Sequence, residues 1–144
     1  MSAPDLAAIR AGKVHDLRNT DFTGADLRGA NLANANLTRA ILTATDFTGA
    51  NLHAADLTEA ILGEADFINA NLTATNLRAT NLTYADFTGA DLTGANLTGA
   101  LLHSAHFDHT NLTGTALTGA DFRGATGLTA IQLTYVKDHG AIGD

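Results

Sequence analysis

Residues 85–99 read Ala-Asp-Phe-Thr-Gly, Ala-Asp-Leu-Thr-Gly, Ala-Asn-Leu-Thr-Gly, which are three consecutive copies of one five-residue unit. The unit extends in both directions, because Leu or Phe occupies every fifth position from Leu17 to Phe122, twenty-two times without interruption. The residue two positions earlier is Ala in fifteen units and Thr in six, and the residue just before the Leu or Phe is Asp or Asn in seventeen. A repeat of this regularity decides the architecture of the whole chain.

A period of five fits neither an α-helix nor a flat β-strand. On a helix, at about 100° per residue, successive leucines would spiral around the rod, and on a strand they would alternate between the two faces. Neither arrangement gives these side chains a shared core. A chain that turns a corner every five residues does, because each Leu or Phe can then point at a central axis. The pattern therefore predicts a coil.

The spacing of the aromatic residues sets the number of sides in each coil. Four phenylalanines recur at intervals of twenty, and Ile41, Ile61 and Leu101, which replace the usual Asp or Asn, keep the same phase. A three-sided coil of fifteen residues would break up these rows. We therefore predict four sides of five residues, with phenylalanines stacked in the core between coils. The predicted aromatic core consists of Phe22, Phe47, Phe67, Phe87, Phe107 and Phe122.

This pattern resembles that of the pentapeptide-repeat proteins over residues 15–124. The resemblance implies an all-β fold, a right-handed quadrilateral parallel β-helix, with the central Leu or Phe and the small residue two positions before it pointing inward. The crossover rule for parallel strands favours the same hand. Roughly 5.5 coils at the sheet spacing of about 4.8 Å would form a rod about 26 Å long. Glycine at the fifth position suits a corner that requires a positive φ.

A cap is expected before the solenoid, in residues 1–14. There Ser2 precedes Pro4, a residue favoured at the first position of a helix, and Gly12 follows a short apolar stretch. We expect Ser2 to cap a short helix that opens at Pro4 and stops at Gly12.

A second cap is expected in residues 125–144, where the repeat phase slips by one after Gly124. Thr129 and Gln132 form a capping-box pattern, which predicts a helix that runs to about Asp138 and ends at His139-Gly140. This helix carries more apolar residues than one face needs. Because terminal helices of some pentapeptide-repeat proteins mediate dimers, the resemblance also implies a homodimer through the C-terminal segment.

Composition excludes several classes of protein. The chain has 144 residues, which is one ordinary domain, and no apolar run approaches the roughly 18 residues of a membrane span. The opening residues lack the basic and apolar pattern of a secretory signal, so a cytoplasmic location is expected. The absence of cysteine excludes disulfides and thiolate chemistry. The net charge of -7 argues against nucleic acid or an anionic membrane as a direct ligand.

The sequence offers little for catalysis. No insertion interrupts the repeats to build a cleft, and no nucleophile elbow, phosphate-binding loop, dinucleotide fingerprint or zinc-protease motif is present. We therefore expect no enzyme activity and no cofactor. The weak candidates for a metal site are His103, His106 and His109, with Asp108 beside them, and the alternative is that these histidines are merely exposed.

Two rows of outward-facing residues are candidates for a partner surface. An acidic row, with one residue per coil, either binds the corners of the backbone locally, as short Asp and Asn side chains do, or forms a stripe for a positively charged partner. An apolar row is either ordinary surface variation or the seat of a partner chain. The acidic row is Asp26, Asp46, Asp66 and Asp86, and the apolar row is Ile41, Ile61 and Leu101.

Charge is concentrated in the middle of the chain. Residues 41–120 hold eight acidic residues and one basic residue, whereas residues 1–40 hold four acidic and five basic residues. The expected function is a non-enzymatic scaffold for protein–protein interaction. The alternative, which the family resemblance suggests, is a DNA-mimicking regulator of a type II topoisomerase such as gyrase. Seven net charges over four coils amount to about one per 2.7 Å, against about one per 1.7 Å for duplex DNA.

Overall fold

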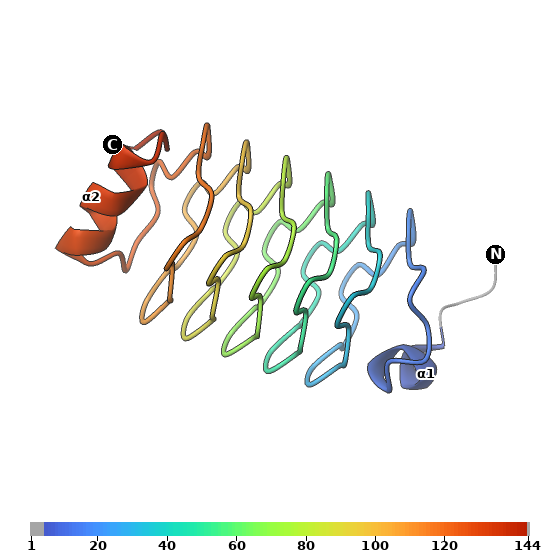
Figure 1. The fold of residues 1–144 in the computed structure, drawn as a ribbon. Helices are drawn as coiled ribbons and strands as arrows, with labels where there is room; N and C mark the ends of the chain where they lie inside the picture. Colours follow the sequence, from blue (N-terminus) through green and yellow to red (C-terminus); the bar gives the residue numbers. More distant parts are fainter. Residues whose placement is uncertain (1–4, 144) are drawn as a thin grey trace.

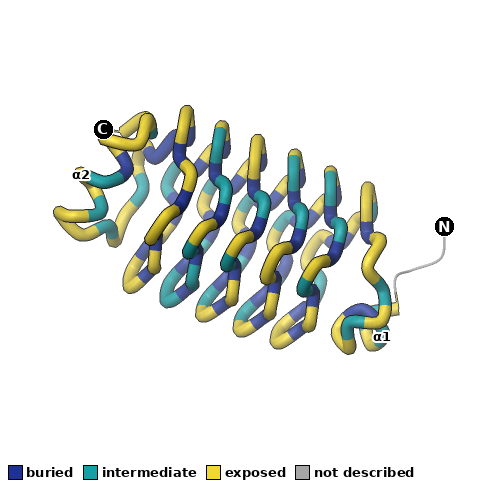
Figure 2. The backbone as a smooth tube through the Cα atoms, viewed as in Figure 1, coloured by how far each residue is buried: buried dark blue, intermediate teal, exposed yellow. Residues whose placement is uncertain are grey.

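The protein is a stack of coils closed by a short helix at each end (Figure 1). The computed structural model describes residues 5–143. Helix α1 spans Leu6–Arg10 and helix α2 spans Ala130–Asp138. Between them the chain winds as a β-helical solenoid, and Figure 2 shows buried residues recurring at regular intervals along every coil.

Parallel β-bridges join residues that lie twenty positions apart, from Asp16–Asn36 to His106–Thr126. In the sides from Leu17 to Phe107, the amide of the central residue donates to the next coil, as from Phe47 to the Asp66 carbonyl at 2.7 Å. Throughout residues 5–143 these bridges stay isolated, because a side of five residues spends two of them on the corner. Twenty residues per coil, in sides of five, match the predicted period. The right-handed sense of the coils stays a prediction.

Each corner is a β-turn with a left-handed residue at its third position. At one corner the Ala50 amide donates to the Phe47 carbonyl at 2.9 Å, and Gly49 has a φ of 69°. A positive φ at the third position only defines a type II turn. The fifth residue of all twenty-two units has a φ between 55° and 76°, yet it is glycine in only nine of them. The other thirteen accept a conformation that disfavours a side chain, because the coil register leaves no alternative.

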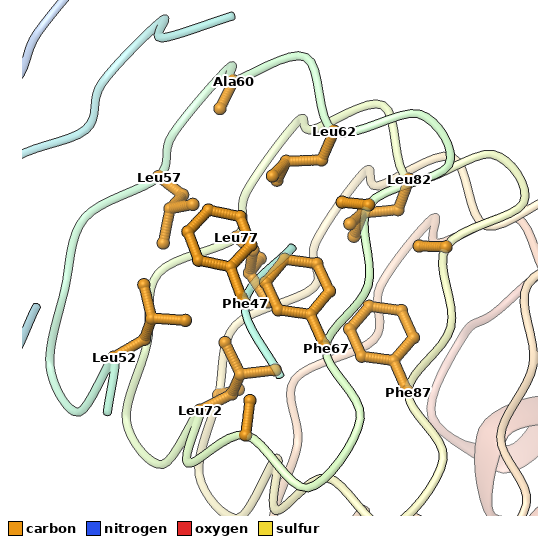
Figure 3. Close-up of a cluster of buried hydrophobic side chains, with 14 of the residues drawn as sticks. Phe47, Leu52, Leu57, Ala60, Leu62, Phe67, Leu72, Leu77, Leu82 and Phe87 are labelled. Atoms are coloured by element: carbon orange, nitrogen blue, oxygen red, sulfur yellow. The ribbon is translucent and has the colours of Figure 1, made fainter. Parts of the chain in front are cut away.

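The lumen is filled by the central residues and the small residues before them. The rings of Phe47, Phe67 and Phe87 stack with centroids 5.0 and 5.2 Å apart and nearly parallel planes (Figure 3). All six phenylalanines are at most 4% exposed. Where Thr replaces Ala, its hydroxyl donates to a backbone carbonyl, as from Thr45 to Phe22 at 2.9 Å. The narrow position therefore tolerates a hydroxyl group because the lumen wall supplies an acceptor.

Helix α1 covers the first coil. Its N-cap is Asp5, whose carboxylate accepts from the Ala8 amide at 3.2 Å, so the expectation that Ser2 caps this helix is wrong. Ser2 and Pro4 themselves lie outside the described residues. Ile9 is buried against the core, and Gly12 follows the helix with a φ of 77°.

Helix α2 closes the other end; it begins after the predicted capping box and ends at Asp138, as His139-Gly140 predicts. The Gln132 amide donates to the Thr129 hydroxyl at 3.1 Å, and the Thr129 amide donates to the Gln132 side chain at 3.0 Å. Val136 is buried against the core. After the helix the chain rejoins the stack, where Ile142 bridges to Asp121. These residues are twenty-one positions apart, so the closing coil contains one extra residue.

Removal of a stacked ring should be costly. Phe67→Ala should lower the free energy of unfolding by about 3–5 kcal/mol, because the rigid lumen cannot collapse around the lost volume. Ala65→Leu should destabilise by about 1–3 kcal/mol, because the narrow position has no spare volume. Ile68→Ala, at the next position outside the lumen, is the control and should cost less than about 1 kcal/mol. Urea unfolding measures all three, and near-parental stability of Phe67→Ala or Ala65→Leu would contradict the inward assignment.

Candidate interaction surface

Asp and Asn before the central residue bind the corner of their own unit. Asp46 accepts from the Thr48 amide at 2.9 Å and from the Thr48 hydroxyl at 2.6 Å. Asn36 makes the same two bonds with Thr38, at 3.1 and 2.6 Å. The side-chain oxygen holds the corner by hydrogen bonds that either residue can make. A negative charge at this position is therefore not required for the turn.

The acidic side is the side of the solenoid that carries Asp26, Asp46, Asp66 and Asp86. Bridges connect these residues in order and continue from Asp86 to His106. Asp26 differs from the others, because both of its carboxylate oxygens accept from the Arg28 guanidinium at 2.9 Å. These bonds hold the pKa of Asp26 well below its usual range. Asp66 and Asp86 form no ion pair with any residue from 5 to 143.

The apolar side precedes the acidic side along each coil. Bridges connect Ile41 to Ile61, then Asn81 and Leu101. The three apolar residues of this row are 36%, 45% and 43% exposed. Tyr84, which is 60% exposed, lies at the corner between this side and Asp86. One corner of the solenoid therefore borders both an apolar row and an acidic row.

The three candidate histidines do not form a metal site. His103 contacts Asp121 in the next coil, with 2.6 Å between the imidazole Nε2 and the carboxylate, whereas His106 contacts the Thr126 hydroxyl at 2.8 Å. His109 occupies the left-handed position of its corner, with a φ of 57°. Within the described part of the chain, no three His, Asp or Glu side chains are placed to hold a metal ion. The candidate fails because the corner after Leu102 directs His103 and His106 to different partners.

Asp121 is the one buried carboxylate of residues 5–143, and its side chain is 6% exposed. The Arg123 guanidinium donates to it at 2.6 and 3.0 Å, and His103 lies on its other side. The Arg123 bonds are the main cause that holds the pKa of Asp121 well below its usual range, against the opposing effect of burial. The backbone of Asp121 also bridges Leu101 to Ile142, so the residue that carries this ion pair is the one that joins the closing segment to the last complete coil.

The comparisons with known proteins agree with this architecture. The pattern of the family described as pentapeptide repeats matches in eight copies, over residues 16–53, 25–63, 50–89, 60–99 and 85–124. The chain belongs to the pentapeptide repeat family. No curated protein sequence matches it. Among residues 5–143 no helix has both the length and the apolar character needed to cross a membrane.

Solved structures of pentapeptide repeat proteins resemble the chain over most of its length. One from the thylakoid lumen of Arabidopsis thaliana is 28% identical, with 97% of this chain and 86% of that chain covered and a TM-score of 0.52. Rfr23 from the cyanobacterium Cyanothece 51142 is 25% identical, with 90% and 88% covered and a TM-score of 0.61. A weaker likeness, 20% identical with 90% and 87% covered and a TM-score of 0.42, is to QnrB1, a plasmid-mediated fluoroquinolone resistance protein.

The buried carboxylate should make the closing segment sensitive to acid. Because the pKa of Asp121 is lower in the folded protein than in the unfolded chain, the unfolded chain takes up the proton first as the pH falls. The stabilisation is therefore complete above the ordinary pKa of about 4 and is lost below it. Asp121→Asn should cost about 1–3 kcal/mol at pH 7, and the difference from the parent should shrink between pH 5 and pH 2.

The matched control is Asp91→Asn, at the same position of a unit in which the carboxylate accepts only from Thr93. It should change the free energy of unfolding by less than about 0.5 kcal/mol at pH 7 and also between pH 5 and pH 2. Urea unfolding at each pH measures these differences. If the cost of Asp121→Asn did not change with pH, the ion pair would not be the source of the stabilisation.

Proposed function

We propose that this protein is a non-enzymatic scaffold that binds a partner protein through the corner between its apolar side and its acidic side. The observation that carries the proposal is the adjacency of the two rows, with Tyr84 between them. Aliphatic and aromatic side chains bordered by charges match the usual composition of a protein interface, in which an apolar centre has a polar rim. The partner would present basic groups to the acidic side, where complementary charge speeds association.

The absence of catalysis is part of the proposal. Catalytic sites need a pocket in which reactive groups converge. The lumen, where such a pocket would lie, is filled with Leu, Phe and Ala side chains that are almost entirely buried. The sides expose mainly Asp, Asn and Thr side chains, and the oxygen of the Asp or Asn is already engaged by the Thr two positions later, as that of Asp46 is by the amide and hydroxyl of Thr48.

A DNA-mimicking regulator of a type II topoisomerase such as gyrase is the alternative. The observation that favours it is the regular recurrence of Asp46, Asp66 and Asp86, one per coil. Two observations weigh against it. The charge density of the middle of the chain is below that of duplex DNA, and Asp26 is neutralised by Arg28. A gyrase supercoiling assay, with and without a quinolone, separates the two functions, because only the mimic would inhibit the enzyme or protect it.

Neutralising the acidic row distinguishes the two proposals at the level of residues. Asp46, Asp66 and Asp86 changed together to Asn should leave the melting temperature unchanged or slightly raised, because Asn makes the same corner bonds and like charges no longer repel. The scaffold proposal expects no inhibition of gyrase by the parent or the variant. If the parent inhibited supercoiling and the triple variant did so at least tenfold less well, the DNA-mimic function would replace the scaffold.

Two further expectations belong to the same proposal. We place the protein in the cytoplasm, which subcellular fractionation would test. We also place a homodimer contact on the Leu133 side of α2, because this residue is 44% exposed on a helix that packs Val136 inward. Light scattering should then give twice the mass of the chain, and Leu133→Lys should reduce it to that of a single chain.

A further inference from the structure

The last coil and helix α2 enclose a groove that neither row of the interaction surface touches. It has a volume of about 710 Å³. One wall is the edge of the last coil at residues 110–114, and the other is formed by Ile131 and Tyr135 of α2. Figure 1 shows α2 lying across this end of the stack, where a further coil would otherwise follow.

The groove exposes an edge of the last coil. In every earlier coil, the coil that follows covers the same edge. On this side the Leu92 amide donates to the Asn111 carbonyl and the Gly94 amide donates to the Thr113 carbonyl, at 2.8 and 2.9 Å. The corresponding amides of the last coil belong to Leu112 and Gly114. No described residue accepts a hydrogen bond from either of them, because the residues twenty positions later are helical.

Helix α2 satisfies only half of this edge. The Gln132 side-chain amide donates to the Thr110 carbonyl at 2.7 Å, and the Tyr135 hydroxyl donates to the Thr115 carbonyl at 3.0 Å. These side chains replace the donors that another coil would have supplied. The acceptors that another coil would have supplied are not replaced, so the edge presents amide donors to the groove.

The remaining lining defines the chemistry of a ligand. Ile131 is 83% exposed, which is the largest exposure among the large apolar side chains of residues 5–143. Asp108 and His109 also line the groove, and no Lys or Arg does. The groove thus combines two backbone donors two residues apart, at the first and third positions of a corner turn, with an uncovered apolar side chain and the negative charge of Asp108.

We propose that this groove binds an extended segment of a partner protein. The segment presents two backbone carbonyls to the amides of Leu112 and Gly114, an apolar side chain to Ile131 and a basic side chain to Asp108. Each earlier coil donates to two carbonyls that lie two residues apart, and two carbonyls on one side of an extended segment have the same spacing. Strand addition at a free edge is a common mode of peptide recognition. The negative charge at Asp108 selects a basic segment over an acidic one.

This site deepens the scaffold function and rests on it, since its ligand is also a protein, but it uses a separate surface. The variant with Asp46, Asp66 and Asp86 changed to Asn leaves the groove intact and should bind its peptides with unchanged affinity. If the groove bound no peptide, the scaffold function would therefore stand or fall separately, by the assay of the interaction surface.

The test uses a phage-displayed library of random heptapeptides, selected on the full-length immobilised protein. The enriched peptides should combine β-branched or aromatic residues with Lys or Arg. Ile131→Lys should weaken their binding at least tenfold, because it removes the apolar wall and adds a like charge. Thr134→Lys adds the same charge at an exposed position of the same helix that does not line the groove, and it should bind within twofold of the parent.

Chemical shifts of the protein locate the bound peptide. On addition of a synthetic copy of the most enriched peptide, the amide proton signals of Leu112 and Gly114 should move downfield as they gain acceptors, and the signal of Gly94 should not. The proposal is overturned if no peptide is enriched or the enriched peptides are acidic, and also if Ile131→Lys binds like the parent or both amide signals stay in place. If the two amide signals of the parent protein moved when the protein self-associated without peptide, the groove would be assigned to a second copy of the chain. That result would also overturn the proposal.

Discussion

The twenty-residue register is the constraint on which the rest of this structure depends. From Leu17 to Phe107 each central amide donates to the coil that follows, and from Asn31 to Thr126 each bridging amide donates to the coil that precedes, as the Asp66 amide does to the Thr45 carbonyl at 3.0 Å. This pairing places equivalent residues directly above one another. Aromatic rings therefore stack on aromatic rings in the lumen, and Asp follows Asp on the acidic side. The surface rows are consequences of the same register that builds the core.

The period of five and the phase of the phenylalanines were enough to predict the sides, the coil length and the inward residues. The capping box at Thr129 predicted the start of α2, because its two hydrogen bonds are local, and His139-Gly140 predicted its end. The N-terminal cap was wrong because Asp5 and Ser2 are both good capping residues, and sequence alone does not rank them there. Corners were predicted to need a positive φ, and the register imposes it even on Tyr84 and Arg39, whose side chains disfavour it.

The candidate site was predictable only in part. The register already places position 121 one coil after Leu101, and so close to His103. The capture of Asp121 by Arg123 was not predicted, although Asp16 and Asp26 pair in the same way with an Arg two positions later. The pairing of Asp26 with Arg28 was not predicted either, and it removes Asp26 from an otherwise uniform acidic row. The groove beside α2 was invisible to the sequence, because it arises where the repeat stops and a helix replaces one coil. Irregularities of the solenoid, more than its regular parts, carry the features that distinguish this chain.

The most direct test of the register compares two deletions by thermal unfolding. Removal of residues 61–80 takes out one complete coil and leaves Phe47, Phe87 and Phe107 in one stack. Removal of residues 61–75 takes out fewer residues but moves the following phenylalanines to another side of the coil. The account predicts that the larger deletion melts at the higher temperature and keeps a single cooperative transition. A shorter deletion that is equally or more stable would contradict the four-sided register.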